Sequence, residues 1–97
     1  MLKLGIAGNP VFHSKSKELF KLISKKNNIE LKYLPISTFN SKSIIDFSKN
    51  FNLNGINITN PLKQSIMELL SKIDYQASNL NSVNTILFNN ESMIGYN

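Results

Sequence analysis

Hydrophobic residues alternate with polar or small residues at the start of the chain, and their period then lengthens. Leu2, Leu4 and Ile6 occupy every second position, as in a strand with one buried face, before a Gly-Asn-Pro segment ends the run. From Ser14 to Asn27-Asn28, apolar residues recur at helical spacing. They are Leu19, Phe20, Leu22 and Ile23. This pattern predicts a strand followed by a helix with one apolar face.

The middle of the chain repeats the alternation of strand and helix. Residues 31–36 indicate a second strand, in which Pro35 favours an edge position or a strand end. A second helical stripe and a short third strand at residues 55–59 follow. The stripe consists of Ile44, Ile45, Phe47 and Phe51. We expect a third helix to begin at Asn60-Pro61, because asparagine is a good N-cap and proline suits the first helical position.

The last third predicts a short helical or irregular segment at residues 75–80 and then two strands, 83–88 and 92–96. Asn89-Asn90-Glu91 joins these strands, and asparagine tolerates the left-handed geometry of a tight turn. Strands separated by helices imply parallel crossovers, whereas a hairpin adds an antiparallel strand. We therefore expect one α/β domain over residues 1–97, with a three-layer, mixed, mostly parallel sheet, helices on both faces and a terminal β-hairpin.

Composition narrows the class of protein. The 97 residues leave little room for a second domain. The absence of cysteine excludes disulfides, thiolate catalysis and zinc sites built on sulfur. No apolar run approaches the ~20 residues of a membrane span, and the opening run is too short for a signal peptide. We expect a cytoplasmic protein with no membrane partner.

The net charge of +5 raises nucleic acid as a partner. However, all 11 cationic residues are lysines, so the bidentate guanidinium fork that reads guanine is missing. The lysines are also scattered from Lys3 to Lys72. We expect a solvated surface and no nucleic-acid partner; salt-dependent binding to DNA or RNA would favour the alternative of a basic interaction domain.

Candidate chemistry gathers at one predicted edge of the sheet. Ligands of open α/β sheets bind outside the carboxyl ends of the parallel strands. The polar loops 9–16 and 59–63 follow strands one and three, and both Asn84-Thr85 and the segment 95–97 would reach the same edge. Four polar segments are thus expected to meet at one cleft.

Lys63 is the most informative residue among them. With Asn60 as cap it would occupy the third helical position, where the helix dipole disfavours a cation by about 0.3–1 kcal/mol. A field that favours the neutral amine suits proton transfer. The alternative is a lysine that extends to water from an ordinary surface helix.

Other polar residues at this edge allow both structural and functional roles. Ser14 and Ser16 stand at the mouth of the first predicted helix, where a serine usually caps but two hydroxyls and free N–H groups also suit a carboxylate. His13 has no carboxylate close in sequence, which favours a structural role. Asn57, Asn84 and Thr85 could bind substrate hydroxyls or satisfy loop backbone.

Two kinds of site are absent from the sequence. Glycines occur only at positions 5, 8, 55 and 95, so no G-x-G-x-x-G or P-loop spacing exists and no dinucleotide site is expected in this chain. The six carboxylates fall mostly on predicted helices and turns and offer neither a metal cluster nor an acid/base pair.

Four segments in register resemble the amino-terminal, substrate-binding domain of shikimate dehydrogenase. They are Gly8-Asn9-Pro10 with His13-Ser14-Lys15-Ser16, Asn57-Ile58-Thr59 with Pro61-Leu62-Lys63, Val83-Asn84-Thr85, and Gly95-Tyr96-Asn97. Their order and spacing hold along the whole chain. Two departures are Lys17, where the family usually has proline, and Asn60, where it usually has an apolar residue.

The resemblance implies an enzyme that reduces 3-dehydroshikimate to shikimate with NADPH, on the route to chorismate and the aromatic amino acids. It implies that Ser14 and Ser16 hold the substrate carboxylate, while Thr59, Asn84 and Lys63 contact the ring hydroxyls. Lys63 would also be the catalytic residue, which gives a proton to the carbonyl oxygen and takes it back in reverse.

The family resemblance also gives an expectation for what lies beyond Asn97. In the family, Gly-Tyr-Asn continues into Thr-Asp, and this aspartate partners the catalytic lysine. We expect the acid partner and the NADP-binding domain to be absent from this chain, which would then be inactive alone. The alternative is a stand-alone module that binds a small acid without catalysis.

Overall fold

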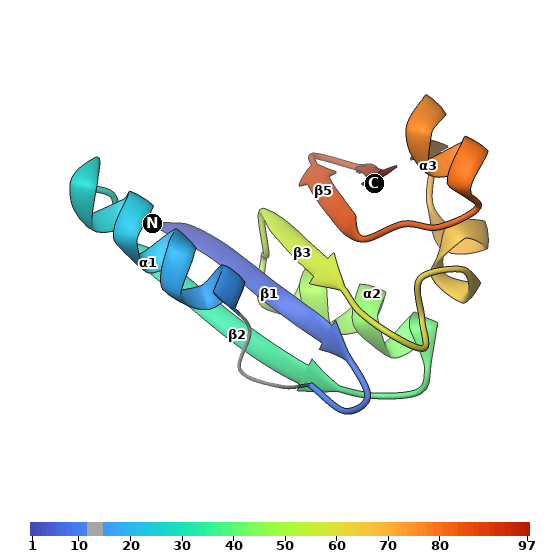
Figure 1. Ribbon diagram of the computed structural model, residues 1–97, viewed down its shortest axis with the longest axis horizontal. Coiled ribbons are helices and arrows are strands. Elements are labelled where there is room, and N and C mark those ends of the chain that lie inside the picture. The colour runs from blue at the N-terminus through green and yellow to red at the C-terminus, as the bar shows by residue number, and fades with distance from the viewer. Residues whose placement is uncertain (12–14) are drawn as a thin grey trace.

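The computed structural model describes residues 1–11 and 15–97, and for residues 15 and 16 it describes the backbone only. Helices and strands follow one another along the chain as the ribbon in Figure 1 shows. The elements are β1 (Leu2–Gly8), α1 (Lys15–Lys26), β2 (Leu31–Ser37), α2 (Ser41–Asn50), β3 (Gly55–Ile58), the 3-10 helix η1 (Ser65–Leu69), β4 (Lys72–Ile73), α3 (Tyr75–Leu80), β5 (Thr85–Asn89) and β6 (Ser92–Tyr96).

One six-stranded sheet runs through the domain in the order β2-β1-β3-β5-β6-β4. Strand β1 pairs in parallel with β2 and β3, and β4 pairs in parallel with β6, whereas β5 is antiparallel to both of its neighbours. The predicted mixed, mostly parallel sheet with a terminal hairpin is therefore confirmed. Strand β2, which contains Pro35, lies at the edge of the sheet as expected.

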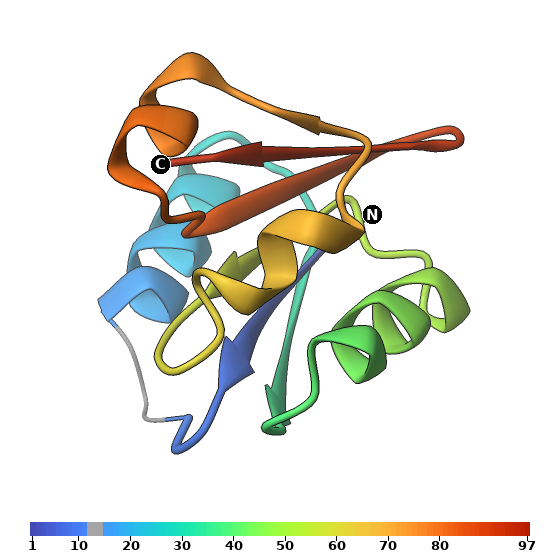
Figure 2. The same cartoon turned by 90° about the vertical axis from the view of Figure 1, so that its right-hand side faces the viewer.

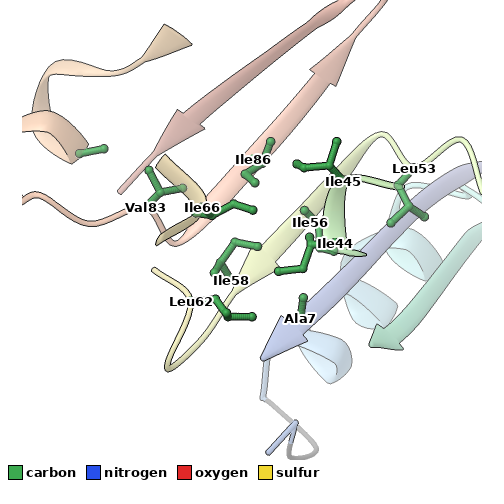
Figure 3. Close-up of a cluster of buried hydrophobic side chains, with 11 residues drawn as sticks. Ala7, Ile44, Ile45, Leu53, Ile56, Ile58, Leu62, Ile66, Val83 and Ile86 are labelled. Atoms are coloured by element: carbon green, nitrogen blue, oxygen red, sulfur yellow. The ribbon is translucent and has the colours of Figure 1, made fainter. Parts of the chain in front are cut away.

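Helices cover both faces of this sheet, which confirms the three-layer prediction. Figure 2 shows α1 and α2 on opposite sides of β1 and β2. The main core lies on the α2 side, where α2, η1 and the buried side chains of β3 and β5 pack together (Figure 3). It consists of Ala7, Ile44, Ile45, Leu53, Ile56, Ile58, Leu62, Ile66, Ala77, Val83 and Ile86.

Most of the apolar face predicted for α1 is exposed in the structure. Phe20 is directed to the sheet, where its ring stacks on Tyr33 of β2 with the ring centroids 5.9 Å apart. The other members of the stripe are exposed: Leu19 by 56%, Leu22 by 65% and Ile23 by 44%. Leu19 and Leu22 lie one and two positions from Phe20 and therefore point elsewhere around the helix. Ile23 lies three positions from Phe20, on the same side, and is nevertheless exposed.

The structure does not contain the third helix predicted to begin at Asn60-Pro61. No α-helix begins at Asn60-Pro61; the Asn60–Pro61 peptide is cis, the Leu62 N–H donates to the Thr59 carbonyl at 3.2 Å, and only the short η1 follows. Carbonyls that would accept helical hydrogen bonds are used elsewhere: that of Asn60 accepts from the Asn9 N–H and that of Lys63 from the Val83 N–H. Tertiary pairing thus replaces the first helical turn.

Asparagine residues lie at helix ends and in the hairpin turn of this fold, where the backbone takes the left-handed conformation. The four non-glycine residues with positive φ in the described part of the chain are all asparagines: Asn28, Asn52, Asn81 and Asn90. Asn28 follows α1 and Asn90 turns the β5–β6 hairpin, as predicted. The sequence pattern missed β4, a strand of only two residues that pairs with β6. In the described residues, no helix is both long and apolar enough to cross a membrane.

Candidate functional site

The loops that follow β1 and β3 meet at the carboxyl edge of the sheet. The Thr59 N–H donates to the Ala7 carbonyl at 2.8 Å, and the Asn9 N–H donates to the Asn60 carbonyl at 3.0 Å. Gly8 lies where the two loops touch: a Cβ atom there would lie 2.9 Å from the Asn60 carbonyl oxygen and would overlap the Thr59 Cγ2 methyl. The absence of a side chain at Gly8 therefore permits the close approach of these loops.

Replacing Gly8 by alanine is expected to destabilise the domain by about 1–3 kcal/mol, because the added methyl must displace a backbone oxygen as well as a side chain. Urea unfolding followed by circular dichroism measures this cost. Gly55→Ala is a milder control, since its Cβ would meet a backbone oxygen and a flexible leucine at 3.2 Å. An equal cost at the two positions would contradict the idea that the two loops are tightly joined at Gly8.

The turn that carries Lys63 is bonded to the start of the hairpin. The Val83 N–H donates to the Lys63 carbonyl at 2.9 Å. The Ile58 N–H donates to the Asn84 carbonyl at 2.8 Å, and the Asn84 N–H donates to the Tyr96 carbonyl at 2.9 Å. The end of β3, the Lys63 turn, the start of β5 and the end of β6 thus share one edge, as the predicted convergence requires.

Two polar groups at this edge are available to a ligand. Thr59 and Lys63 are both partly buried. Among the residues that the structure describes, neither the Thr59 hydroxyl nor the Lys63 ammonium has a hydrogen-bond or ion-pair partner. A hydroxyl offers one donor and two acceptor positions, and an ammonium offers three donors. Backbone hydrogen bonds join the loop that carries both residues to the segment that carries Asn84. We call Thr59, Lys63 and Asn84 the polar cluster.

The remaining predicted binding residues are not placed. His13 and Ser14 lie outside the described residues, and the side chain of Ser16 is not described. Helix α1 begins at Lys15, next to these serines, as the sequence indicates. The distance between their hydroxyls and the Lys63 amine is therefore not part of the described geometry.

Side chains across three strands are linked by hydrogen bonds toward Asn84. The Tyr33 hydroxyl of β2 donates to Asn57 Oδ1 of β3 at 3.1 Å, and Asn57 Nδ2 donates to Thr85 Oγ1 of β5 at 3.2 Å. The Thr85 hydroxyl in turn donates to Asn84 Oδ1 at 3.0 Å. Three of these residues were candidates from sequence, but Tyr33 was not, because a tyrosine in a strand carries no local signal of a polar network.

The same chain continues to the end of β6. Asn84 Nδ2 lies 3.4 Å from Asn97 Oδ1, to which it donates, and Asn97 Nδ2 donates to the Ser82 backbone carbonyl at 3.0 Å. The side chain of Asn84 is thus held on both sides. We call the series Tyr33-Asn57-Thr85-Asn84-Asn97 the amide chain.

The electrostatic reasoning for Lys63 needs correction. It lies in the turn before η1, whose cap is Gln64, and not in the first turn of an α-helix. The helix dipole that the sequence analysis invoked for the Lys63 amine is therefore absent, because no α-helix begins just before Lys63. A functional role of Lys63 depends instead on its neighbours in the polar cluster. Within residues 1–11 and 15–97, no three His, Asp or Glu side chains are close enough to hold a metal ion.

Comparison with known proteins matches residues 6–86 to the family described as the shikimate dehydrogenase substrate binding domain. Shikimate dehydrogenase (NADP(+)) of Clostridium botulinum is 36% identical over 100 residues, which cover 100% of this chain and 38% of that protein. The crystal structure of shikimate dehydrogenase 1 from Peptoclostridium difficile has a TM-score of 0.89 and 32% identity, over 100% of this chain and 37% of that one.

A third relative was crystallised with a ligand. Shikimate 5-dehydrogenase from Thermus thermophilus, in complex with shikimate, has a TM-score of 0.87 and 26% identity over 100% of this chain and 38% of that one. This chain thus spans little more than a third of the length of each of these relatives. Because the family match covers most of the described residues, the chain belongs to the family of shikimate dehydrogenase substrate-binding domains.

Proposed function

We propose that residues 1–97 are the substrate-binding domain of an NADP-dependent shikimate dehydrogenase that reduces 3-dehydroshikimate to shikimate. The reaction would belong to the cytoplasmic route to chorismate and the aromatic amino acids. The family match and the dehydrogenase names of the curated relatives support an enzyme. The same names do not favour a stand-alone module that only binds a small acid.

The polar cluster carries this proposal. Thr59 and Lys63 come from one loop and Asn84 from a second segment, and backbone hydrogen bonds hold the two segments together at one edge of the sheet. A hydroxyl, an ammonium and an amide in this position suit the several oxygens of a hydroxylated ring acid. Ser14 and Ser16 would hold the substrate carboxylate at the mouth of α1.

Lys63 would be the catalytic residue in this site. During reduction, the carbonyl carbon gains a hydride while the carbonyl oxygen takes a proton from the Lys63 ammonium, which leaves a hydroxyl and a neutral amine. In the reverse direction, the amine removes the hydroxyl proton as the hydride leaves. Thr59 and Asn84 would orient the ring so that the reacting oxygen faces the amine.

The residues of this chain do not fit a nicotinamide dinucleotide. Its four glycines all lie in strands, in β1, β3 and β6, and a Cβ at each would contact neighbouring atoms. A dinucleotide site instead uses glycines in a turn that leads into a helix. We propose that NADP is held by a part of the enzyme that corresponds to the unmatched length of the relatives, and that Lys63 contributes the proton only.

A titration of the ¹⁵N-labelled chain with shikimate tests the site by NMR. We expect chemical-shift changes to concentrate at Ser14, Ser16, Thr59, Lys63 and Asn84. Cyclohexanecarboxylate is the matched control ligand, because it keeps the carboxylate and lacks the ring hydroxyls. It should shift the two serines and leave the polar cluster unchanged. Absent shifts, or shifts spread evenly over the chain with shikimate, would refute the assignment.

A further inference from the structure

The amide chain has a direction that is set at one end. The backbone carbonyl of Ser82 can only accept a hydrogen bond, so Asn97 must turn its NH₂ group toward it, at 3.0 Å. This orientation leaves Asn97 Oδ1 facing Asn84, at 3.4 Å from Nδ2. An oxygen there requires a donor, so Asn84 must present its NH₂ group on this side.

The direction then passes to the next residues. With Nδ2 toward Asn97, Asn84 has its Oδ1 on the side of Thr85, whose hydroxyl donates to it at 3.0 Å. The Thr85 hydroxyl has used its only hydrogen, so its oxygen accepts from Asn57 Nδ2 at 3.2 Å. Asn57 Oδ1 is left to accept from the Tyr33 hydroxyl.

The opposite direction fails at the Ser82 end. If Asn84 turned over, its Oδ1 would face Asn97 Oδ1, and two acceptors would be in contact without a hydrogen. If Asn97 also turned over, its Oδ1 would face the Ser82 carbonyl oxygen with the same result. Tyr33 does not oppose either direction, because a phenol can donate or accept. One backbone carbonyl therefore fixes the orientation of both amides near the polar cluster.

We propose that Thr85 and Asn97 are positioning residues that hold Asn84 as a hydrogen-bond donor to the substrate. The inference rests on the proposed function, since it takes Asn84 as a ligand of shikimate. The Thr85 hydroxyl donates to one of the two acceptor positions of Asn84 Oδ1, while the NH₂ group of Asn84 has a second hydrogen beyond the one directed to Asn97. Asn84 would thus donate this hydrogen to a substrate oxygen that accepts a hydrogen bond.

This orientation has a consequence for recognition of the ring. While Lys63 is an ammonium it also offers donors only, so an oxygen bound by Lys63 and Asn84 must then accept from both. A carbonyl oxygen can do so without any hydrogen of its own. A hydroxyl can do so only if it turns its own hydrogen toward another acceptor, for which the Thr59 oxygen is available. The site therefore favours a ring substituent whose oxygen can accept and disfavours an ammonium group in its place, which can only donate.

Thr85→Val and Thr85→Ser form the matched pair that tests the proposal. Valine keeps the branched shape of threonine and removes the hydroxyl, whereas serine keeps the hydroxyl and removes the methyl. The first measurement is the pair of Asn84 side-chain amide signals in the ¹⁵N NMR spectrum of the full chain without ligand. The second is the dissociation constant of shikimate from the NMR titration.

We expect Thr85→Val to move or broaden the Asn84 amide signals and to weaken shikimate binding about tenfold, the usual scale for loss of one hydrogen bond. Thr85→Ser should keep both signals and bind within about twofold of the original chain. Dispersed backbone signals in each variant confirm that the fold is retained. If Thr85 had only a structural role, both variants would bind shikimate more weakly, and the Asn84 amide signals of Thr85→Ser would differ from those of the original chain as they do in Thr85→Val.

Two results separate this inference from the proposed function. If Thr85→Val leaves the Asn84 signals and the dissociation constant unchanged, the positioning role is overturned. If the original chain fails to bind shikimate while Thr85→Val still moves the Asn84 signals and Thr85→Ser does not, the hydrogen-bond direction is upheld and the assignment of shikimate is overturned.

Discussion

Replacing Lys63 by methionine should weaken shikimate binding by about ten- to a hundredfold. A hydrogen bond from a charged donor contributes about 1.5–3 kcal/mol, and each 1.4 kcal/mol is a factor of ten in affinity. Methionine keeps an unbranched apolar stem of similar length, so the packing of the turn should persist. The fold of the variant is checked by its backbone NMR spectrum and its affinity by titration.

Lys49→Met is the matched control for this change. It removes the same charge from an exposed residue in the last turn of α2, next to the hairpin turn at the opposite edge of the sheet. We expect its affinity for shikimate to stay within about twofold of the original chain, because solvent and salt screen a distant surface charge. Equal losses in the two variants would mean that Lys63 acts only through the net charge and would remove it from the site.

Truncating Ile66 to alanine is expected to destabilise the domain by about 2–5 kcal/mol, the range for removing a large side chain from a packed core. Ile66 belongs to η1 and is completely buried. Figure 3 shows its side chain in the buried cluster beside Val83 and Ile86. Small domains have a free energy of unfolding of about 5–15 kcal/mol, so this loss is a large fraction of the total.

The consequence should extend to the site, because η1 directly follows the Lys63 turn. Leu69→Ala is the control within the same 3-10 helix, since Leu69 is 36% exposed and loses fewer contacts. Urea unfolding of both variants compares their stabilities. A cost for Ile66→Ala no greater than that for Leu69→Ala would show that η1 is not fixed by its buried isoleucine.

The sequence predicted which segments meet at the candidate site but not which side chains pair there. The rule that ligands bind at the carboxyl ends of parallel strands selected the loops after β1 and β3, and the hairpin brought Asn84 to the same edge. Backbone hydrogen bonds do join these segments. The amide chain was beyond sequence reasoning, because its residues are 13 to 28 positions apart in three of its four side-chain contacts and nothing local pairs them.

The electrostatic argument for Lys63 shows how a sound local rule can fail. Asparagine followed by proline is a good start for a helix, and the apolar residues after it have helical spacing. The carbonyls of Asn60 and Lys63 nevertheless accept from Asn9 and Val83. These donors lie in other loops, so no pattern within residues 60–73 indicates them.

The sequence alone determined the features that depend on neighbouring residues. The period of apolar positions defined β1, β2, β3, the hairpin and the two longer helices, and asparagine supplied the left-handed turns at Asn28 and Asn90. Each of these follows from the sterics of one residue or the spacing of a short run, which the folded environment did not override.

Only the tertiary structure decided which residues face the core and which partner each polar group takes. It left the apolar stripe of α1 exposed apart from Phe20, and it replaced the first turn of the third helix by long-range hydrogen bonds. It also fixed the direction of the amide chain through the Ser82 carbonyl. The physical reason is the same in each case: burial and hydrogen-bond partners depend on which segments meet in space, and that information is spread over the whole chain.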